Sequence, residues 1–268
     1  MPAVRSRPTT RKPFDPEDFR APLGVHLEDL RGRIIRVALV LVAGMTLGWF
    51  LQPWVYQTLS QVARELIPKD VEYKEVFRNV TDAFMLKMRL AFYIGIFITL
   101  PLTVLQLWGF IAPGLKESER RPLKIVAPLS LFLFALGTWF CWLILPSAFA
   151  WFLSYLPEFK DTAVYQEPGT LIFFIVKMLL SFGVGFQLPL VVFFLAKVGI
   201  ITDESLKQSW RQYTVGIFTG AAILTPSNDL FSMMMMAVPL TLLFFLSILA
   251  IKITSKSRDR DPALDELD

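Results

Sequence analysis

Long apolar stretches alternate with short charged segments along this chain. Runs without Asp, Glu, Lys or Arg cover residues 37–63 and 125–157, and each exceeds the roughly 18 residues that mark a membrane-span candidate. Backbone groups inside hydrocarbon must be hydrogen-bonded within their own segment, so we expect helices. A membrane barrel would alternate apolar and polar residues, whereas residues 129–134 have apolar side chains at both odd and even positions. The predicted spans are 34–52, 84–109, 123–146, 170–196, 212–224 and 230–251.

Proline interrupts four of these predicted spans, at Pro101, Pro128, Pro189 and Pro239. Proline removes a backbone donor and tends to kink its helix. Kinked helices of different tilt would leave a concave face, which is a plausible docking surface. The alternative is the ordinary tolerance of proline in membrane helices. The predicted fold class is therefore all-α: a polytopic membrane protein of six transmembrane helices, in which the kinked helices form a concave face, with both termini cytoplasmic.

The two ends of the chain lack such spans. Residues 1–22 contain five Pro and five basic residues without an apolar core, which predicts a disordered cytoplasmic arm and no cleavable signal peptide. We expect the six-helix domain to cover residues 23–252 and a cytoplasmic tail to cover residues 253–268.

Composition and charge refine this picture. The chain has 268 residues, 54% of them hydrophobic, and a net charge of +4. With both termini in the cytoplasm, nineteen of the 27 Lys and Arg lie inside and five lie outside. This positive-inside bias predicts that orientation and makes a nucleic-acid partner unnecessary to explain the basic pI.

Three features of the connections carry further expectations. Residues 53–80 have apolar positions at helical spacing, which suits an amphipathic helix on the outer membrane surface or a cap packed on the spans. Residues 147–169 are rich in aromatic side chains that would anchor at the interface. The span at 212–224 rises only about 20 Å, so it either thins the bilayer, lies against its neighbours, or extends a few residues further.

Catalytic chemistry is poorly represented. His26 is the only His and Cys141 the only Cys, so a metal site, a nucleophile relay and an internal disulfide are not expected. We predict no enzymatic activity, no cofactor and no bound metal. Two cytoplasmic clusters stand out instead, because acids in them, Asp29 and Glu119, are not needed to orient the chain.

Polar residues within the spans are the remaining candidates. Lys87 and Arg89 can snorkel to the interface, while Lys177 lies deeper and has no assigned role. Gln187 would form a helix–helix hydrogen bond or line the concave face. The run of methionines that begins at Met233 is an adaptable contact surface, for the core or for a partner.

Four segments together resemble the TatC family, the multi-spanning subunit of the twin-arginine protein translocase. Residues 26–33 read His-Leu-Glu-Asp-Leu-Arg-Gly-Arg, and residues 108–121 read Trp-Gly-Phe-Ile-Ala-Pro-Gly-Leu-Lys-Glu-Ser-Glu-Arg-Arg. Residues 182–189 read Phe-Gly-Val-Gly-Phe-Gln-Leu-Pro, and residues 222–229 read Ala-Ile-Leu-Thr-Pro-Ser-Asn-Asp. Their order and their places in a six-span chain make the resemblance specific, and it covers about 23–252.

The resemblance implies a receptor for signal peptides with paired arginines. Folded proteins would cross the cytoplasmic membrane of a prokaryote, driven by the proton motive force, with single-span TatA/TatB-type partners and self-association of the chain. In the family the loop carboxylate, here Glu119, contacts the arginines of the signal, and the N-terminal acid, here Asp29, supports it. The signal-peptide site implied by these motifs comprises Glu119, Asp29, Glu28, Phe110, Leu115, Arg120 and Gln187.

The partner site implied by the resemblance is the turn before the last span, with Thr225, Asp229 and Met233. The chain departs from the family at Asp29, where Glu is usual, and at Gln187, where many relatives carry Glu. An amide does not titrate, so the resemblance gives Gln187 no proton-relay role. A secondary transporter of a small solute is the alternative function, although the two halves show no convincing repeat.

Overall fold

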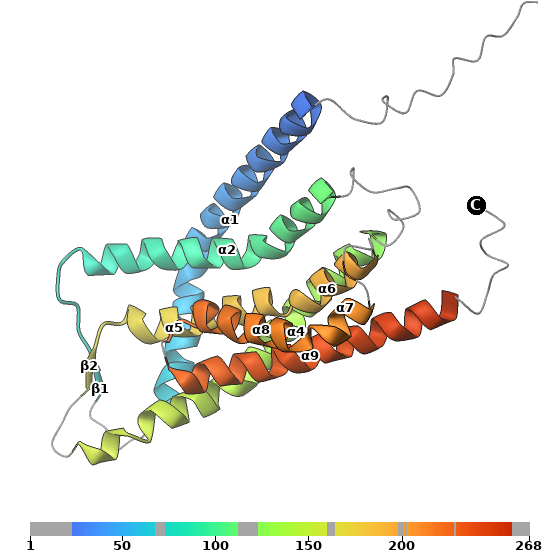
Figure 1. Cartoon of the computed structure of the whole chain (residues 1–268). Helices are drawn as coiled ribbons and strands as arrows, with labels where there is room; N and C mark the ends of the chain where they lie inside the picture. Colours follow the sequence, from blue (N-terminus) through green and yellow to red (C-terminus); the bar gives the residue numbers. More distant parts are fainter. Residues whose placement is uncertain are drawn as a thin grey trace, which may run out of the picture.

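The protein is almost entirely helical in its computed structural model, which describes residues 23–67, 73–111, 123–159, 164–197, 201, 203–227 and 229–258. Figure 1 shows long helices that run between the end where the two short strands lie and the end where the first helix begins, with the first helix crossing the second. We call these the sheet end and the opposite end. The elements in chain order are α1 (Leu23–Leu66), β1 (Tyr73–Glu75), α2 (Asp82–Ile111), α4 (Leu123–Leu153), η3 (Leu156–Glu158), β2 (Val164–Gln166), α5 (Gly169–Gly185), α6 (Leu188–Lys197), α7 (Asp203–Gln208), α8 (Trp210–Leu224) and α9 (Leu230–Arg258).

Five segments of the described chain are long and apolar enough to cross a membrane: Leu30–Leu66, Asp82–Gln106, Pro128–Leu153, Gly169–Ala196 and Leu230–Leu249. They correspond to five of the six predicted spans and make this a multi-pass membrane protein. The sixth candidate, α8, has 15 residues, two more than predicted, and rises about 22 Å against about 30 Å of hydrocarbon.

The sequence predicted that the first span ends at residue 52, directly before Pro53, but the helix continues beyond this proline. Helix α1 continues through Pro53 to Leu66 without a break. Its last turns are not a surface helix, because Leu59 and Ala63 are buried against α2, α4 and α5. The packed cap, one of the two expected alternatives, is the arrangement found, and the apolar contacts on this stretch offset the backbone bond that proline removes.

The predicted span at 170–196 is found as the membrane-span candidate Gly169–Ala196, and it consists of two helices, α5 and α6. They are separated at Phe186 and Gln187, and Pro189 is the second residue of α6, where proline is tolerated because it lies at a helix start. The helix α4 is longer than predicted and continues past Pro146 to Leu153. The helix α9 runs to Arg258 and thus includes the first residues of the predicted tail. The predicted arm at 1–22 lies outside the described residues.

Apolar packing forms two main clusters. The one nearer the sheet end joins α1, α2, α4 and α5 through residues such as Leu90, Leu145 and Ile175. The other joins α4, α5 and α6 to the last helices through Phe182, Met236 and Phe244, all fully buried. The two strands were not predicted: β1 and β2 pair in parallel with Tyr73 opposite Val164, so the two connections at the sheet end are joined by backbone hydrogen bonds.

Candidate functional site

At the opposite end of the molecule, the start of α1 lies beside the end of α2. Arg33 on α1 donates from Nη1 to the backbone oxygen of Gln106 on α2, at 3.5 Å. Glu28, little more than one helical turn before Arg33, is exposed at this end. The N-terminal acidic segment is therefore next to the end of α2, from which the connection at 112–122 continues.

Most predicted signal-peptide residues lie in or beside that connection. Leu115, Glu119 and Arg120 lie outside the described residues. Asp29 belongs to α1 and Phe110 to the last turn of α2, and the structure describes their backbone only. The described part of the chain therefore places Glu28 near the end of α2.

Gln187 is 7% exposed and forms a helix–helix hydrogen bond, which is one of its two expected roles. Its Oε1 accepts from Ser130 Oγ at 2.7 Å, and its Nε2 donates to the backbone oxygen of Ser130 at 3.0 Å. Both ends of the amide are thus engaged with one residue of α4. Sequence reasoning missed Ser130, because a single Ser in an apolar helix has no distinguishing pattern.

The predicted partner residues Thr225, Asp229 and Met233 are brought together at the turn between α8 and α9. Thr225 is buried and donates to the backbone oxygen of Ala221, while Asp229 Oδ1 accepts from the backbone N–H of Ser232 and caps α9. Burial raises the pKa of Asp229, but hydrogen bonding, which includes the bond from the backbone N–H of Ser232, lowers it more, and the pKa lies below its ordinary value. Met233 packs against the main apolar cluster.

An apolar hollow of about 420 Å³ opens between α2, α4 and α5. Its lining includes Phe97 on α2, Leu179 on α5, and the exposed rings of Trp139 and Trp142 on α4. A hollow of this kind suits an apolar segment better than a polar solute.

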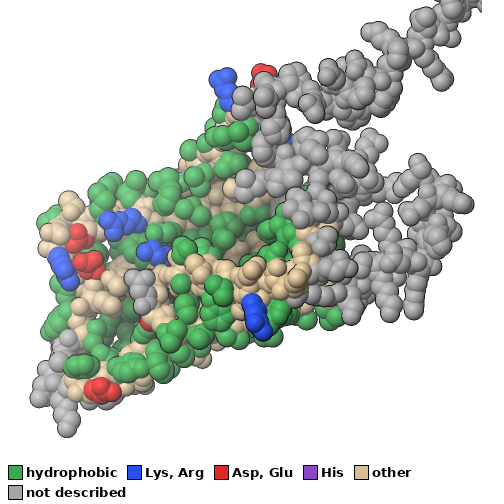
Figure 2. Space-filling view, viewed as in Figure 1, with side chains coloured by type: hydrophobic (Ala, Val, Ile, Leu, Met, Phe, Trp, Pro, Cys, Tyr) green, Lys and Arg blue, Asp and Glu red, His purple; other side chains and the backbone are tan. Residues whose placement is uncertain are grey.

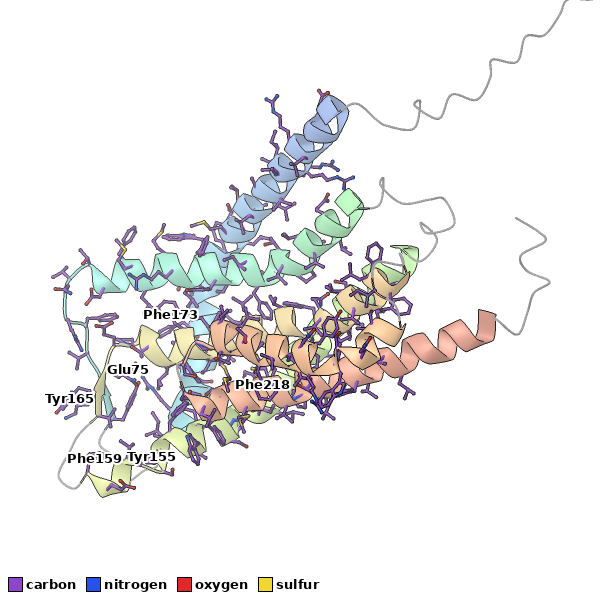
Figure 3. The ribbon with its side chains drawn as sticks, in the orientation of Figure 1. Glu75, Tyr155, Phe159, Tyr165, Phe173 and Phe218 are labelled. Carbon is purple, nitrogen blue, oxygen red and sulfur yellow. The ribbon has the colours of Figure 1, made fainter. Side chains whose placement is uncertain are left out.

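Aromatic side chains from the predicted interfacial segment at 147–169 gather at the sheet end. Tyr155, Phe159 and Tyr165 are exposed and lie around the strands (Figure 3). Arg64 pairs with Glu75 at 3.3 Å, and burial together with the Glu75 carboxylate raises the pKa of Tyr73 to about 12.

The cations within the spans have aromatic neighbours. Lys87 Nζ lies 4.4 Å from the ring centre of Trp49 on α1, a close cation–π contact. Lys177 Nζ lies 5.9 Å from the ring centre of Tyr93 on α2. Neither ring was identified from the sequence, although both are aromatic residues within predicted spans.

Small residues form the contact between α1 and α2, and the sequence analysis overlooked them. Gly44 and Gly48 on α1 face Ala91, Gly95 and Thr99 on α2, where an added Cβ would collide with the facing backbone or side chain. The spacing of four between Gly44 and Gly48, and between Ala91 and Gly95, is the small-residue motif that lets membrane helices approach closely. This signal was available in the sequence.

Comparison with known proteins gives consistent results. The family model for TatC, the Sec-independent protein translocase protein, matches residues 25–239. Curated TatC proteins of Desulforapulum autotrophicum and Azotobacter chroococcum are 31% and 34% identical, over 91% and 89% of this chain and 89% and 91% of their own lengths. The crystal structure of the twin-arginine translocase receptor TatC aligns with a TM-score of 0.70 at 28% identity, covering 86% of this chain and 99% of that one. This chain therefore belongs to the TatC family of Sec-independent protein translocase proteins.

Proposed function

We propose that this chain is the receptor subunit of a twin-arginine translocation system. It binds the twin-arginine signal peptide of a folded cargo protein in the cytoplasm and supports export across the inner membrane, driven by the proton motive force. The observation that carries this proposal is the contact between Arg33 and the backbone of Gln106, because it holds the segment of Glu28 and Asp29 beside the helix that leads to Glu119.

The chemistry of the acids matches the ligand. A guanidinium group is planar and permanently charged, and it binds a carboxylate through two parallel hydrogen bonds. Glu119 is the main acceptor in this proposal and Asp29 or Glu28 supports it, while Phe110, Leu115 and Arg120 lie along the bound peptide. A lysine in the signal would bind less well because it cannot reproduce the fork.

The apolar part of the signal peptide would follow the hollow between α2, α4 and α5. Its exposed tryptophan rings offer apolar area near the membrane. Gln187 belongs to the proposed site because it sets the shape of the surrounding surface. Its bonds to Ser130 hold α4 against the start of α6. Direct contact with the peptide would require these bonds to be exchanged.

Single-span TatA/TatB-type subunits would bind beside α8 and the turn that follows it. Val215 and Ile223 on α8 are 65% and 78% exposed, and Thr225, Asp229 and Met233 lie at its sheet-side end. The proposed orientation places the opposite end, and both termini, in the cytoplasm, in accordance with the positive-inside bias.

The test substitutes Glu119 by Ala and measures crosslinking of a twin-arginine signal peptide to position 115, together with export of a folded reporter. We expect both to fall strongly, because a charge-assisted hydrogen bond contributes roughly 1.5–3 kcal/mol, or about a tenfold change or more in affinity. Glu117→Ala, two residues away in the same connection, is the matched control and should retain both. Normal crosslinking and export by the Glu119 variant would refute the proposed site.

A further inference from the structure

Two basic residues inside the membrane-spanning region are not used by the proposed function. Arg89 on α2 and Lys177 on α5 are both exposed. Figure 2 shows basic side chains surrounded by hydrophobic ones on the face of the molecule that it presents. Ionisable groups at such positions are costly, so they are functional candidates by default.

Both residues flank one aromatic contact between α2 and α5. The ring of Tyr93 lies 5.6 Å from that of Phe173, which occupies the side of α5 near α2 (Figure 3). Arg89 precedes Tyr93 by four residues and Lys177 follows Phe173 by four residues, so each is the helical neighbour of one ring. Lys177 also lies over Tyr93, so the two cations border the same surface.

The two cations lie at similar depth. Helices α2 and α5 both begin at the sheet end, and Arg89 is seven residues from the start of α2, about 10 Å, while Lys177 is eight residues from the start of α5, about 12 Å. The span Asp82–Gln106 is about 37 Å long against about 30 Å of hydrocarbon. Long basic side chains at this depth can extend to the headgroup layer of the leaflet on the sheet side.

Three of the described carboxylates near the sheet end, Asp82, Glu75 and Glu167, are already engaged. Asp82 accepts from the backbone N–H groups of Arg78 and Asn79. Glu75 pairs with Arg64, and Glu167 pairs with Arg78 at 3.4 Å. Among the described residues, none provides a carboxylate partner for Arg89 or Lys177. Lys87 differs from these two, because it is partly buried and lies close over Trp49.

We propose that Arg89 and Lys177 bind the phosphate of an anionic phospholipid from the leaflet on the sheet side. A phosphate is the abundant anion at the depth that these side chains reach, and two cations around one surface complement its charge. The exposed apolar residues on the spans adjoin the acyl chains, so the lipid presents its headgroup to the cations and its chains to the helices. In the orientation proposed above, this is the outer leaflet.

The experiment reconstitutes the full chain in nanodiscs of mixed phosphatidylglycerol and phosphatidylethanolamine, then counts retained lipids by native mass spectrometry. The wild type should retain phosphatidylglycerol preferentially, and the double variant Arg89→Gln with Lys177→Gln should retain it roughly tenfold less, as expected from the loss of charge-assisted hydrogen bonds. The charge-preserving pair Arg89→Lys with Lys177→Arg should keep most of the retention and also controls for folding.

Arg78→Gln is the matched control, because Arg78 is an exposed arginine near the sheet end that already pairs with Glu167. Its lipid retention should equal that of the wild type. Equal retention by the double Gln variant would overturn the proposal and leave the two cations as side chains that merely snorkel. A photo-crosslinker at position 177 that captures a protein subunit in native membranes, instead of phospholipid, would also overturn it.

Discussion

A single buried amide connects two helices at the break between α5 and α6. Gln187 follows the last turn of α5, and its side chain would be costly in an apolar interior without hydrogen-bond partners. Ser130 provides both a donor and an acceptor, so each end of the amide is paired. The pair fixes the position of α4 relative to the start of α6 and thereby the shape of the surface near Gln187.

We predict that Ser130→Ala and Gln187→Leu each lower stability and that their effects are coupled. Ser130→Ala removes the bond to Oε1 but keeps the backbone acceptor, and interhelical side-chain bonds in membranes contribute about 0.6 kcal/mol on average and up to about 1.7 kcal/mol. The coupling energy from a double-mutant cycle, measured by unfolding in one detergent, should fall in this range.

Ser247→Ala is the matched control for that cycle. Ser247 is also buried, at 7% exposed against 0% for Ser130, but its hydroxyl donates to the backbone oxygen of Leu243 in the same helix. It should therefore show no coupling to Gln187. A coupling energy near zero between Ser130 and Gln187 would contradict the role given to their bond.

At the residue scale, the sequence identifies chemistry but not pairing. The need of Gln187 for a partner follows from its amide and its apolar surroundings, and a helix–helix bond was one of the two expectations. Ser130 is 57 residues away and could not be selected, because apolar spans commonly contain single Ser residues. The same reason hides the contacts of Lys87 with Trp49 and of Lys177 with Tyr93.

At the scale of elements, α1 and α2 pack closely against each other through small residues. Glycines remove the side-chain volume that would hold the helices apart, and a Cβ at Gly95 would lie 2.7 Å from the backbone nitrogen of Met45. Lipid is as apolar as the helix surface, so close van der Waals packing stabilises such a contact in place of apolar burial.

We predict that Gly48→Ala destabilises the protein by about 1–3 kcal/mol, the usual cost of overpacking. The added methyl group would collide with the backbone oxygen of Ala91, and backbone atoms cannot turn aside. The melting temperature in a fixed detergent measures the effect.

Gly216→Ala on α8 controls for the change of helix propensity, because nothing lies within 4 Å of an added Cβ there. It should be neutral or stabilising by up to about 1 kcal/mol. Similar melting temperatures for Gly48→Ala and Gly216→Ala would contradict the prediction, because they would show that α1 and α2 can move apart at little cost in stability.

Most elements could be predicted because apolar length directly reflects membrane thickness. The exceptions have local causes. The end of α1 was misplaced because proline is read as a helix stop, whereas packing of Leu59 and Ala63 holds the helix beyond Pro53. The strands β1 and β2 were missed because each has three residues and its partner strand lies 91 positions away in the sequence.

At the scale of the whole molecule, α8 departs from the usual length of a span. Its last residue lies deep, because Ser181, twelve residues into α5, donates to the backbone oxygen of Leu224. Measured along α5 from its sheet-side end, the sheet-side end of α8 therefore lies roughly 18 Å deeper in the membrane. A short, recessed helix favours local thinning of the bilayer around α8 and the start of α9.

The proposed orientation predicts which side of the membrane each end of the molecule faces. Cys141 is the only cysteine and is fully buried, so single cysteines can be introduced with little background labelling. The reagent is a membrane-impermeant maleimide. Glu158→Cys, near the sheet end, should react with it in cells whose outer layer is opened but whose inner membrane is intact. Gln208→Cys, at the end of α7, should react only after the inner membrane is broken. Both positions are exposed, so accessibility is set by the membrane and not by packing. The reverse pattern would invert the orientation, place the acidic segments outside the cell, and remove the basis for recognising a signal peptide in the cytoplasm.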